Sequence, residues 1–147
     1  MEIGLEDKFK QVLYKNPKLT YFGWGVPEEL KLYREGKSEE IENRRKELRD
    51  QLFNSFVEFE RAYNFCSQLE KLTKINPKHT SFSYKQHAEE YCSDKVSNGA
   101  FIAAAIAAGF KKRVDEFNPN VWFNINERSL VRLLNSRTPV NIPNELK

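Results

Sequence analysis

The feature that most constrains the fold is a stretch without polar side chains: residues 100–108 read AFIAAAIAA. A helix that is apolar on every face is buried on most sides, and its small alanines let neighbouring backbones come close. We expect Ser97 or Asn98 to cap this helix and Gly109 to end it. Two arrangements stay open: the rest of the chain covers this helix completely, for which a domain of about 150 residues is long enough, or the helix lies exposed in a groove-reading position.

Composition favours a mostly α-helical protein with a small β part. Charged residues make up 31% of the 147 residues and hydrophobic residues 39%, a balance that fits solvated helical faces better than a sandwich or a barrel. The longest apolar run is far shorter than the ~18 residues that a membrane-spanning helix needs. Two cysteines, Cys66 and Cys92, do not make a disulfide framework, so we expect free thiols and a cytoplasmic location.

We expect residues 1–76 to form a helical subdomain, a hairpin or bundle built on one long helix over residues 38–75. Its apolar side chains, spaced alternately by four and three residues, predict a stripe that packs against another helix. This stripe consists of Leu48, Leu52, Phe56, Phe59, Tyr63 and Cys66. The opposite side of the helix, with Arg49 and Lys71, is expected to face water.

Residues 77–147 are expected to form a small α+β subdomain. A helix that ends near Cys92 and a turn precede the alanine-rich helix. Two β-prone runs, 110–114 and 121–125, flank a turn-forming segment and predict a β-hairpin, and a last helix should follow over residues 127–134. Helix, turn, helix, hairpin and helix is the order of a winged helix, so we expect a winged-helix-like unit.

The net charge of +3 lies entirely in residues 77–147. Consecutive basic side chains at the start of the hairpin, and a basic pair one turn apart on the last helix, can neutralise phosphates. Two polar side chains at the start of the alanine-rich helix can reach base edges. The residues expected to bind nucleic acid are Lys111, Lys112, Arg113, Arg128, Arg132, Ser97 and Asn98. The sequence thus predicts a nucleic-acid-binding accessory protein; the structural alternative is an α+β core whose central helix is fully covered.

A second class of function depends on the aromatic residues Tyr21, Phe22 and Trp24. Exposed Trp and Tyr side chains dominate binding hot spots, so these residues and the long amphipathic helix predict a protein-interaction module, such as an adaptor or an inhibitor of a host enzyme. In the alternative interpretation the rings clamp a loop onto the core.

The sequence contains none of the common catalytic or phosphate-loop motifs, so we expect a non-enzymatic protein without a cofactor. His79, His87, Cys66 and Cys92 are residue types that bind zinc, but their spacings match no finger or ribbon, and no metal site is expected. The segment 96–102, followed by Gly109-Phe110 and by Pro119-Asn120-Val121, resembles short uncharacterised proteins of bacterial mobile elements. This resemblance favours an accessory protein over a metabolic enzyme and assigns no residue roles.

Overall fold

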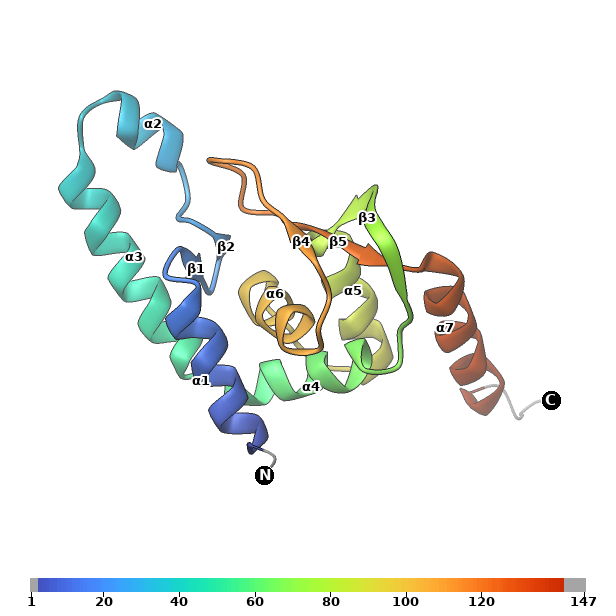
Figure 1. Ribbon diagram of the computed structural model, residues 1–147. Coiled ribbons are helices and arrows are strands. Elements are labelled where there is room, and N and C mark those ends of the chain that lie inside the picture. The colour runs from blue at the N-terminus through green and yellow to red at the C-terminus, as the bar shows by residue number, and fades with distance from the viewer. Residues whose placement is uncertain (1–2, 142–147) are drawn as a thin grey trace.

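A mostly helical chain with two small antiparallel sheets is seen in the computed structural model, which describes residues 3–141 and the side chains up to residue 136 (Figure 1). The helices are α1 (Leu5–Lys15), α2 (Glu29–Arg34), α3 (Ser38–Phe53), α4 (Phe56–Cys66), α5 (Ser81–Cys92), α6 (Asn98–Ala107) and α7 (Glu127–Asn141). The strands are β1 (Leu19–Thr20), β2 (Gly23–Trp24), β3 (Lys71–Thr80), β4 (Lys112–Arg113) and β5 (Trp122–Ile125).

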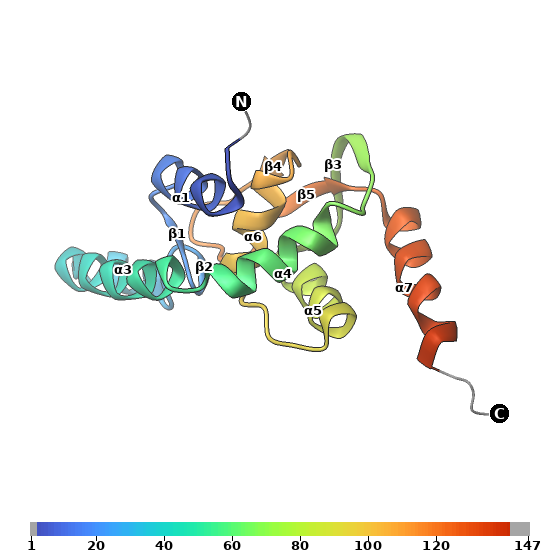
Figure 2. The same cartoon turned by 90° about the horizontal axis from the view of Figure 1, so that it is seen from below.

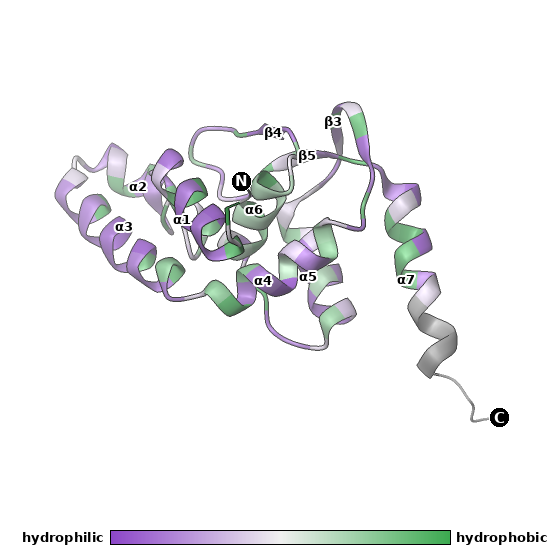
Figure 3. Cartoon of the chain, turned by 60° about the horizontal axis from the view of Figure 1, so that its bottom comes forward, coloured by the Kyte–Doolittle hydropathy of each residue, from purple (hydrophilic) through white to green (hydrophobic). Residues whose placement is uncertain are grey.

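The alanine-rich helix α6 lies at the centre of the fold, as in the alternative in which the central helix is fully covered. All residues from 98 to 105 are buried, and α6 packs against α1, α4, α5 and the β1–β2 hairpin (Figures 1 and 2). Ser97 caps α6, because its hydroxyl accepts a hydrogen bond of 3.0 Å from the Ala100 N–H. Gly109 ends the helix with a φ of +93°, a conformation that glycine adopts without strain. In Figure 3 the ribbon of α6 is pale green, toward the hydrophobic end of the scale, whereas most of α3 has the purple of hydrophilic residues.

The predicted single helix over residues 38–75 is wrong, because α3 and α4 are separate helices and β3 begins at Lys71. Two side chains at the first break compete for the helix backbone. The Asn54 amide and the Ser55 hydroxyl donate to the carbonyls of the residues four positions earlier, at 2.9 and 2.7 Å. Such bonds offer the chain an alternative to helix continuation. The predicted stripe is nevertheless buried in part, with Leu52 and Phe59 fully inaccessible.

The predicted hairpin is present, since β4 pairs antiparallel with β5. The third strand, β3, was missed; it pairs with the other edge of β5, so the order in the sheet is β3-β5-β4. Asn124 on β5 is buried and joins both neighbours: it accepts from the Lys111 N–H and donates to the Leu72 carbonyl, each at 2.7 Å. Strand β3 runs through residue 76, where the boundary between the two halves was expected, and one hydrophobic cluster contains residues from both halves.

Helices α2 and α3 form an arm with its own small core. Val26, Leu32 and Ile41 are buried together, apart from the main cluster, and the arm extends away from α6 (Figure 1). At its outer end, the Tyr33 ring lies 5.5 Å from the ring of Phe117 in the β4–β5 loop.

Arg49 is half-buried and bonded to backbone carbonyls, whereas the long helix was expected to turn it toward water. Its guanidinium donates three hydrogen bonds of 2.8 to 3.0 Å to the carbonyls of Leu13, Asn16 and Leu19. These carbonyls lie at the end of α1 and at the start of β1, so Arg49 ties the N-terminal segments to α3. Burial, with a contribution from the charge of Arg45, lowers the pKa of Arg49.

Arg49→Ala should lower the free energy of unfolding by roughly 2–4 kcal/mol, because it leaves three carbonyls without their charged donor. Lys46→Ala, at an exposed position on the same helix, should change stability by less than about 0.5 kcal/mol. Chemical denaturation of both variants measures the difference. Equal, small effects would contradict a structural role for the Arg49 contacts.

Candidate functional site

The three basic side chains of the hairpin are exposed and held by different neighbours. Lys111 donates to a backbone carbonyl of β3 at 3.1 Å. The Lys112 ammonium lies 5.9 Å from the centre of the Trp24 ring, and the Arg113 guanidinium lies 4.7 Å from that of Trp122. Attraction between a cation and an aromatic face positions both of these groups.

Strand β3 contributes basic residues that were expected in the long helix, over residues 38–75, or in no predicted helix or strand. Lys71, Lys74 and Lys78 are all exposed, and the strands β3, β4 and β5 contain no acidic residue. We call the surface formed by β3, β4, β5 and the adjoining Lys111 the basic sheet. The β-branched residues Thr73 and Ile75 are the sequence signal that could have predicted β3.

The other two predicted basic residues belong to α7, which lies on the β3 side of the sheet and away from β4 (Figures 1 and 2). A shallow hollow of about 490 Å³ brings them to the β3 edge of the basic sheet; it is lined by Lys78, Glu127, Arg128, Val131 and Arg132. Arg132 is paired with Glu70 at 2.8 Å, and Arg128 is exposed.

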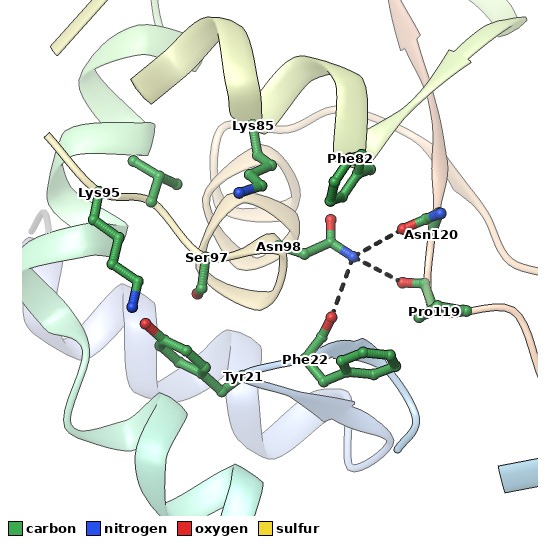
Figure 4. A pocket seen from close by; sticks show the side chains of 10 residues that line it. Tyr21, Phe22, Phe82, Lys85, Lys95, Ser97, Asn98, Pro119 and Asn120 are labelled. Atoms are coloured by element: carbon green, nitrogen blue, oxygen red, sulfur yellow. Dashed lines mark hydrogen bonds between the residues drawn. The ribbon is translucent and has the colours of Figure 1, made fainter. Parts of the chain in front are cut away.

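The two polar residues predicted to reach base edges lie instead in a pocket, together with two of the predicted aromatic residues (Figure 4). This Asn98 pocket has a volume of about 480 Å³ and is lined by Tyr21, Phe22, Phe82, Lys85, Lys95, Val96, Ser97, Asn98, Pro119 and Asn120. Trp24, the third predicted aromatic residue, lies under Lys112. The pocket thus joins residues that the sequence analysis placed in two different functional sets.

Asn98 joins the segments that build this pocket. Its amide nitrogen lies 3.1 to 3.3 Å from three acceptors: the carbonyls of Phe22 and Pro119 and the side-chain oxygen of Asn120. These acceptors fix which end of the amide carries nitrogen. The other end, Asn98 Oδ1, is buried and has no hydrogen-bond partner within the described part of the chain.

Two glycines allow the β1–β2 hairpin to reach the start of α6. A Cβ on Gly99 would stand 1.9 Å from the Thr20 carbonyl oxygen, and a Cβ on Gly23 would stand 2.5 Å from the Pro119 carbonyl oxygen. Real Cβ atoms cannot occupy either place. Consequently, the walls of the pocket depend on backbone contacts that other residues would prevent.

Two carboxylates that do not line the pocket accept hydrogen bonds from the backbone of Val96 and Ser97. Glu58 accepts from the Ser97 N–H at 2.7 Å and from the Tyr21 hydroxyl at 2.9 Å. Glu89 accepts from the Val96 N–H at 3.0 Å. Burial, together with Glu58, raises the pKa of Tyr21, and the hydrogen bond with Tyr21 raises the pKa of Lys95. The Tyr21 hydroxyl and the Lys95 ammonium therefore keep their protons at neutral pH.

A second polar cluster, missed by the sequence analysis, lies where β3 meets α7. Glu127 Oε2 accepts from the Tyr84 hydroxyl at 2.8 Å and lies 2.5 Å from His79 Nδ1. Burial opposes ionisation of Glu127, but the hydrogen bonds from His79 and Tyr84 and the charges of His79 and Lys78 lower its pKa. Burial and the bond to Glu127 raise the pKa of Tyr84. The cluster connects α5, β3 and α7.

Residues 3–141 contain no group of three or more His, Cys, Asp or Glu side chains that could hold a metal ion. Within the same part of the chain, no helix is long and apolar enough to cross a membrane. Comparison with protein-family models, curated proteins and solved structures found no match. A functional proposal for this chain rests on its own geometry.

Gly99→Ala should destabilise the protein by at least about 2 kcal/mol, since the new methyl group collides with the Thr20 carbonyl and the backbone must move. This loss would exceed the gain of about 1 kcal/mol that alanine normally brings to a helix interior. Gly4→Ala is the control, because that position has open space around it. Thermal melts that rank the two variants alike would disprove the close approach.

Glu127→Gln should destabilise the protein more at neutral pH than in acid. A lowered native pKa means that the carboxylate contributes stability above the pKa of the unfolded chain, which is lost as pH falls through the native pKa. The difference between wild type and variant should therefore narrow below about pH 4. Tyr84→Phe, which removes one of the two hydrogen bonds, provides the comparison. Urea denaturation at several pH values measures the free energies of unfolding. A difference between wild type and Glu127→Gln that stays constant with pH would contradict a contribution from the ionised Glu127 carboxylate.

Proposed function

We propose that the protein binds single-stranded nucleic acid on the basic sheet and is not an enzyme. The observation that supports this function is the charge of the strands: exposed basic residues occupy both edge strands, and none of the three strands has an acidic residue. Cations along a surface neutralise phosphates and release counterions, which supplies most of the affinity in non-specific binding.

The sheet also offers a surface for base stacking. Trp122 lies on the central strand, and the Arg113 guanidinium covers its ring at 4.7 Å. Unpaired bases stack on aromatic rings and on guanidinium planes. The strand register places Arg113 directly opposite Trp122, so the two groups form one platform between the lysines of the edge strands.

Burial of α6 favours this use of the sheet over groove reading. In the winged-helix-like unit expected from the sequence, the second helix would enter a major groove. Helix α6 holds that position but is buried from residue 98 to 105. A sheet that binds flexible strands needs no exposed recognition helix. Asp115 and Glu116, in the loop after β4, mark one end of the basic surface.

The double variant Lys111→Glu with Arg113→Glu should abolish oligonucleotide binding, because it places two like charges against the phosphates. Both side chains are exposed, so stability should change by less than about 1 kcal/mol. Lys10→Glu with Lys18→Glu makes the same change of charge at exposed positions of the N-terminal half and should leave binding nearly intact.

Fluorescence anisotropy with single-stranded and duplex oligonucleotides at two salt concentrations measures these effects. Single strands should bind more tightly than duplex, and Lys74→Gln should lower the salt slope by about 0.7. If the double variant binds oligonucleotides as wild type does, the basic sheet is not the binding surface. If wild type binds no oligonucleotide at low salt, the proposal fails, and the protein-interaction module that uses Tyr21, Phe22 and Trp24 replaces it.

A further inference from the structure

The Asn98 pocket has two chemically different ends (Figure 4). Among the described residues that line it, the charged ones are Lys85 and Lys95, whose ammonium groups lie toward Ser97 and Tyr21; that of Lys85 also lies 5.3 Å from the centre of the Phe82 ring, so the two ends adjoin. The rings of Phe22 and Phe82 lie on opposite sides of the Asn98 amide and are 38% and 47% exposed. An amphipathic ligand would therefore bind in one direction, with its anion at the lysines and its apolar part at the rings.

Asn98 supplies a specific acceptor at the aromatic end. The residue is 8% exposed, and its Oδ1 has no hydrogen-bond partner among the described residues. The three acceptors around the amide nitrogen prevent the side chain from turning the oxygen toward another donor. A buried acceptor without a partner is costly, so a ligand that brings an N–H group to this oxygen gains a hydrogen bond and removes that cost.

The lysines remain able to bind an anion although carboxylates lie nearby. Glu58 and Glu89 accept from the N–H groups of Ser97 and Val96, and neither of them lines the pocket. Lys85 donates to Glu89 at 3.2 Å, which uses one of the three donors of its ammonium group. Lys95 lies 5.6 Å from the centre of the Tyr21 ring and forms a hydrogen bond with Tyr21, which uses one of the three donors of its ammonium group.

We propose that the Asn98 pocket binds one nucleotide. The base lies between Phe22 and Phe82 and donates an N–H to Asn98 Oδ1, and the phosphate lies between Lys85 and Lys95. A volume of about 480 Å³ is within the range of small-molecule sites. This site is separate from the basic sheet and does not require strand binding there. A free mononucleotide and a single nucleotide of a strand offer the same groups.

The test titrates the full-length ¹⁵N-labelled protein with AMP, with adenosine and with a short 5′-phosphorylated oligonucleotide. Calorimetry measures affinity, and NMR follows the side-chain amide of Asn98. AMP should bind, should shift the Asn98 amide signals, and should bind about tenfold more tightly than adenosine, which lacks the phosphate. AMP that binds better than the oligonucleotide identifies a free nucleotide as the ligand; the reverse order identifies a nucleotide within a strand.

Three variants examine the two ends of the site. Lys85→Gln and Lys95→Gln should each weaken AMP about tenfold and leave adenosine nearly unchanged. Phe82→Ala, at an exposed position, should weaken AMP and adenosine alike, by roughly fivefold or more. Lys10→Gln is the matched control and should affect neither ligand. Because these changes avoid Asn98 and the two glycines of the pocket, the variants should fold as wild type does.

Several results would overturn the nucleotide site. The first is that neither AMP nor the oligonucleotide binds to the pocket. The second is that neither Lys85→Gln nor Lys95→Gln changes the affinity for AMP. The third is that AMP does not shift the NMR signals of the Asn98 side-chain amide. Binding of an acidic tryptophan-containing peptide in place of AMP would equally overturn it and would assign the pocket to a protein partner. The Lys111→Glu, Arg113→Glu double variant should bind AMP normally, so failure of the sheet proposal and failure of the pocket proposal are distinguishable.

Discussion

The close contact between the β1–β2 hairpin and the first turn of α6 is the constraint on which the rest of the structure depends. Most side chains of helix α6 are small and apolar, so the neighbouring elements pack close to its backbone. At Gly99 the neighbouring group is the backbone carbonyl of Thr20. Hydrogen bonds connect this contact to the rest of the chain. Asn98 donates to the β1–β2 hairpin and to the β4–β5 loop, and Ser97 caps the helix and donates its backbone N–H to Glu58. The contact that buries the apolar helix therefore also builds the pocket.

Polar side chains that bond to distant backbone complete what apolar packing begins. Arg49 joins α3 to the end of α1, Asn98 joins α6 to two loops, and Asn124 joins the three strands of the basic sheet. Each satisfies carbonyl or N–H groups that would otherwise be buried without partners. The small sheet and the short hairpin have few ladder bonds of their own, and these side chains take the place of longer strands.

The parts of the fold that follow from local pattern were predictable. The apolar helix, its cap at Ser97, its end at Gly109 and the antiparallel hairpin each depend on residue type and spacing within a few positions. The helix break at Asn54 and Ser55 was not predicted, because the apolar stripe keeps its spacing of four and three residues across it. The strand that begins at Lys71 was also missed, since its first residues were assigned to the same long helix. The Asn98 pocket was also beyond prediction: its residues come from four segments, and only the folded chain shows that Tyr21 and Phe22 lie beside Ser97 and Asn98.

The arm formed by α2 and α3 and the region around α6 should differ in the free energy of local unfolding. The arm's cluster of Val26, Leu32 and Ile41 is small and separate from the main core, so the arm can unfold at a lower free energy than the region around α6, as a cooperative unit of its own. Its ring contact with Phe117 joins the arm to the β4–β5 loop, and Pro119 of the same loop lines the Asn98 pocket. Amide protection along α3 should therefore rise from Ser38 toward Phe53, and a ligand in the pocket would slow exchange in an arm that it does not touch.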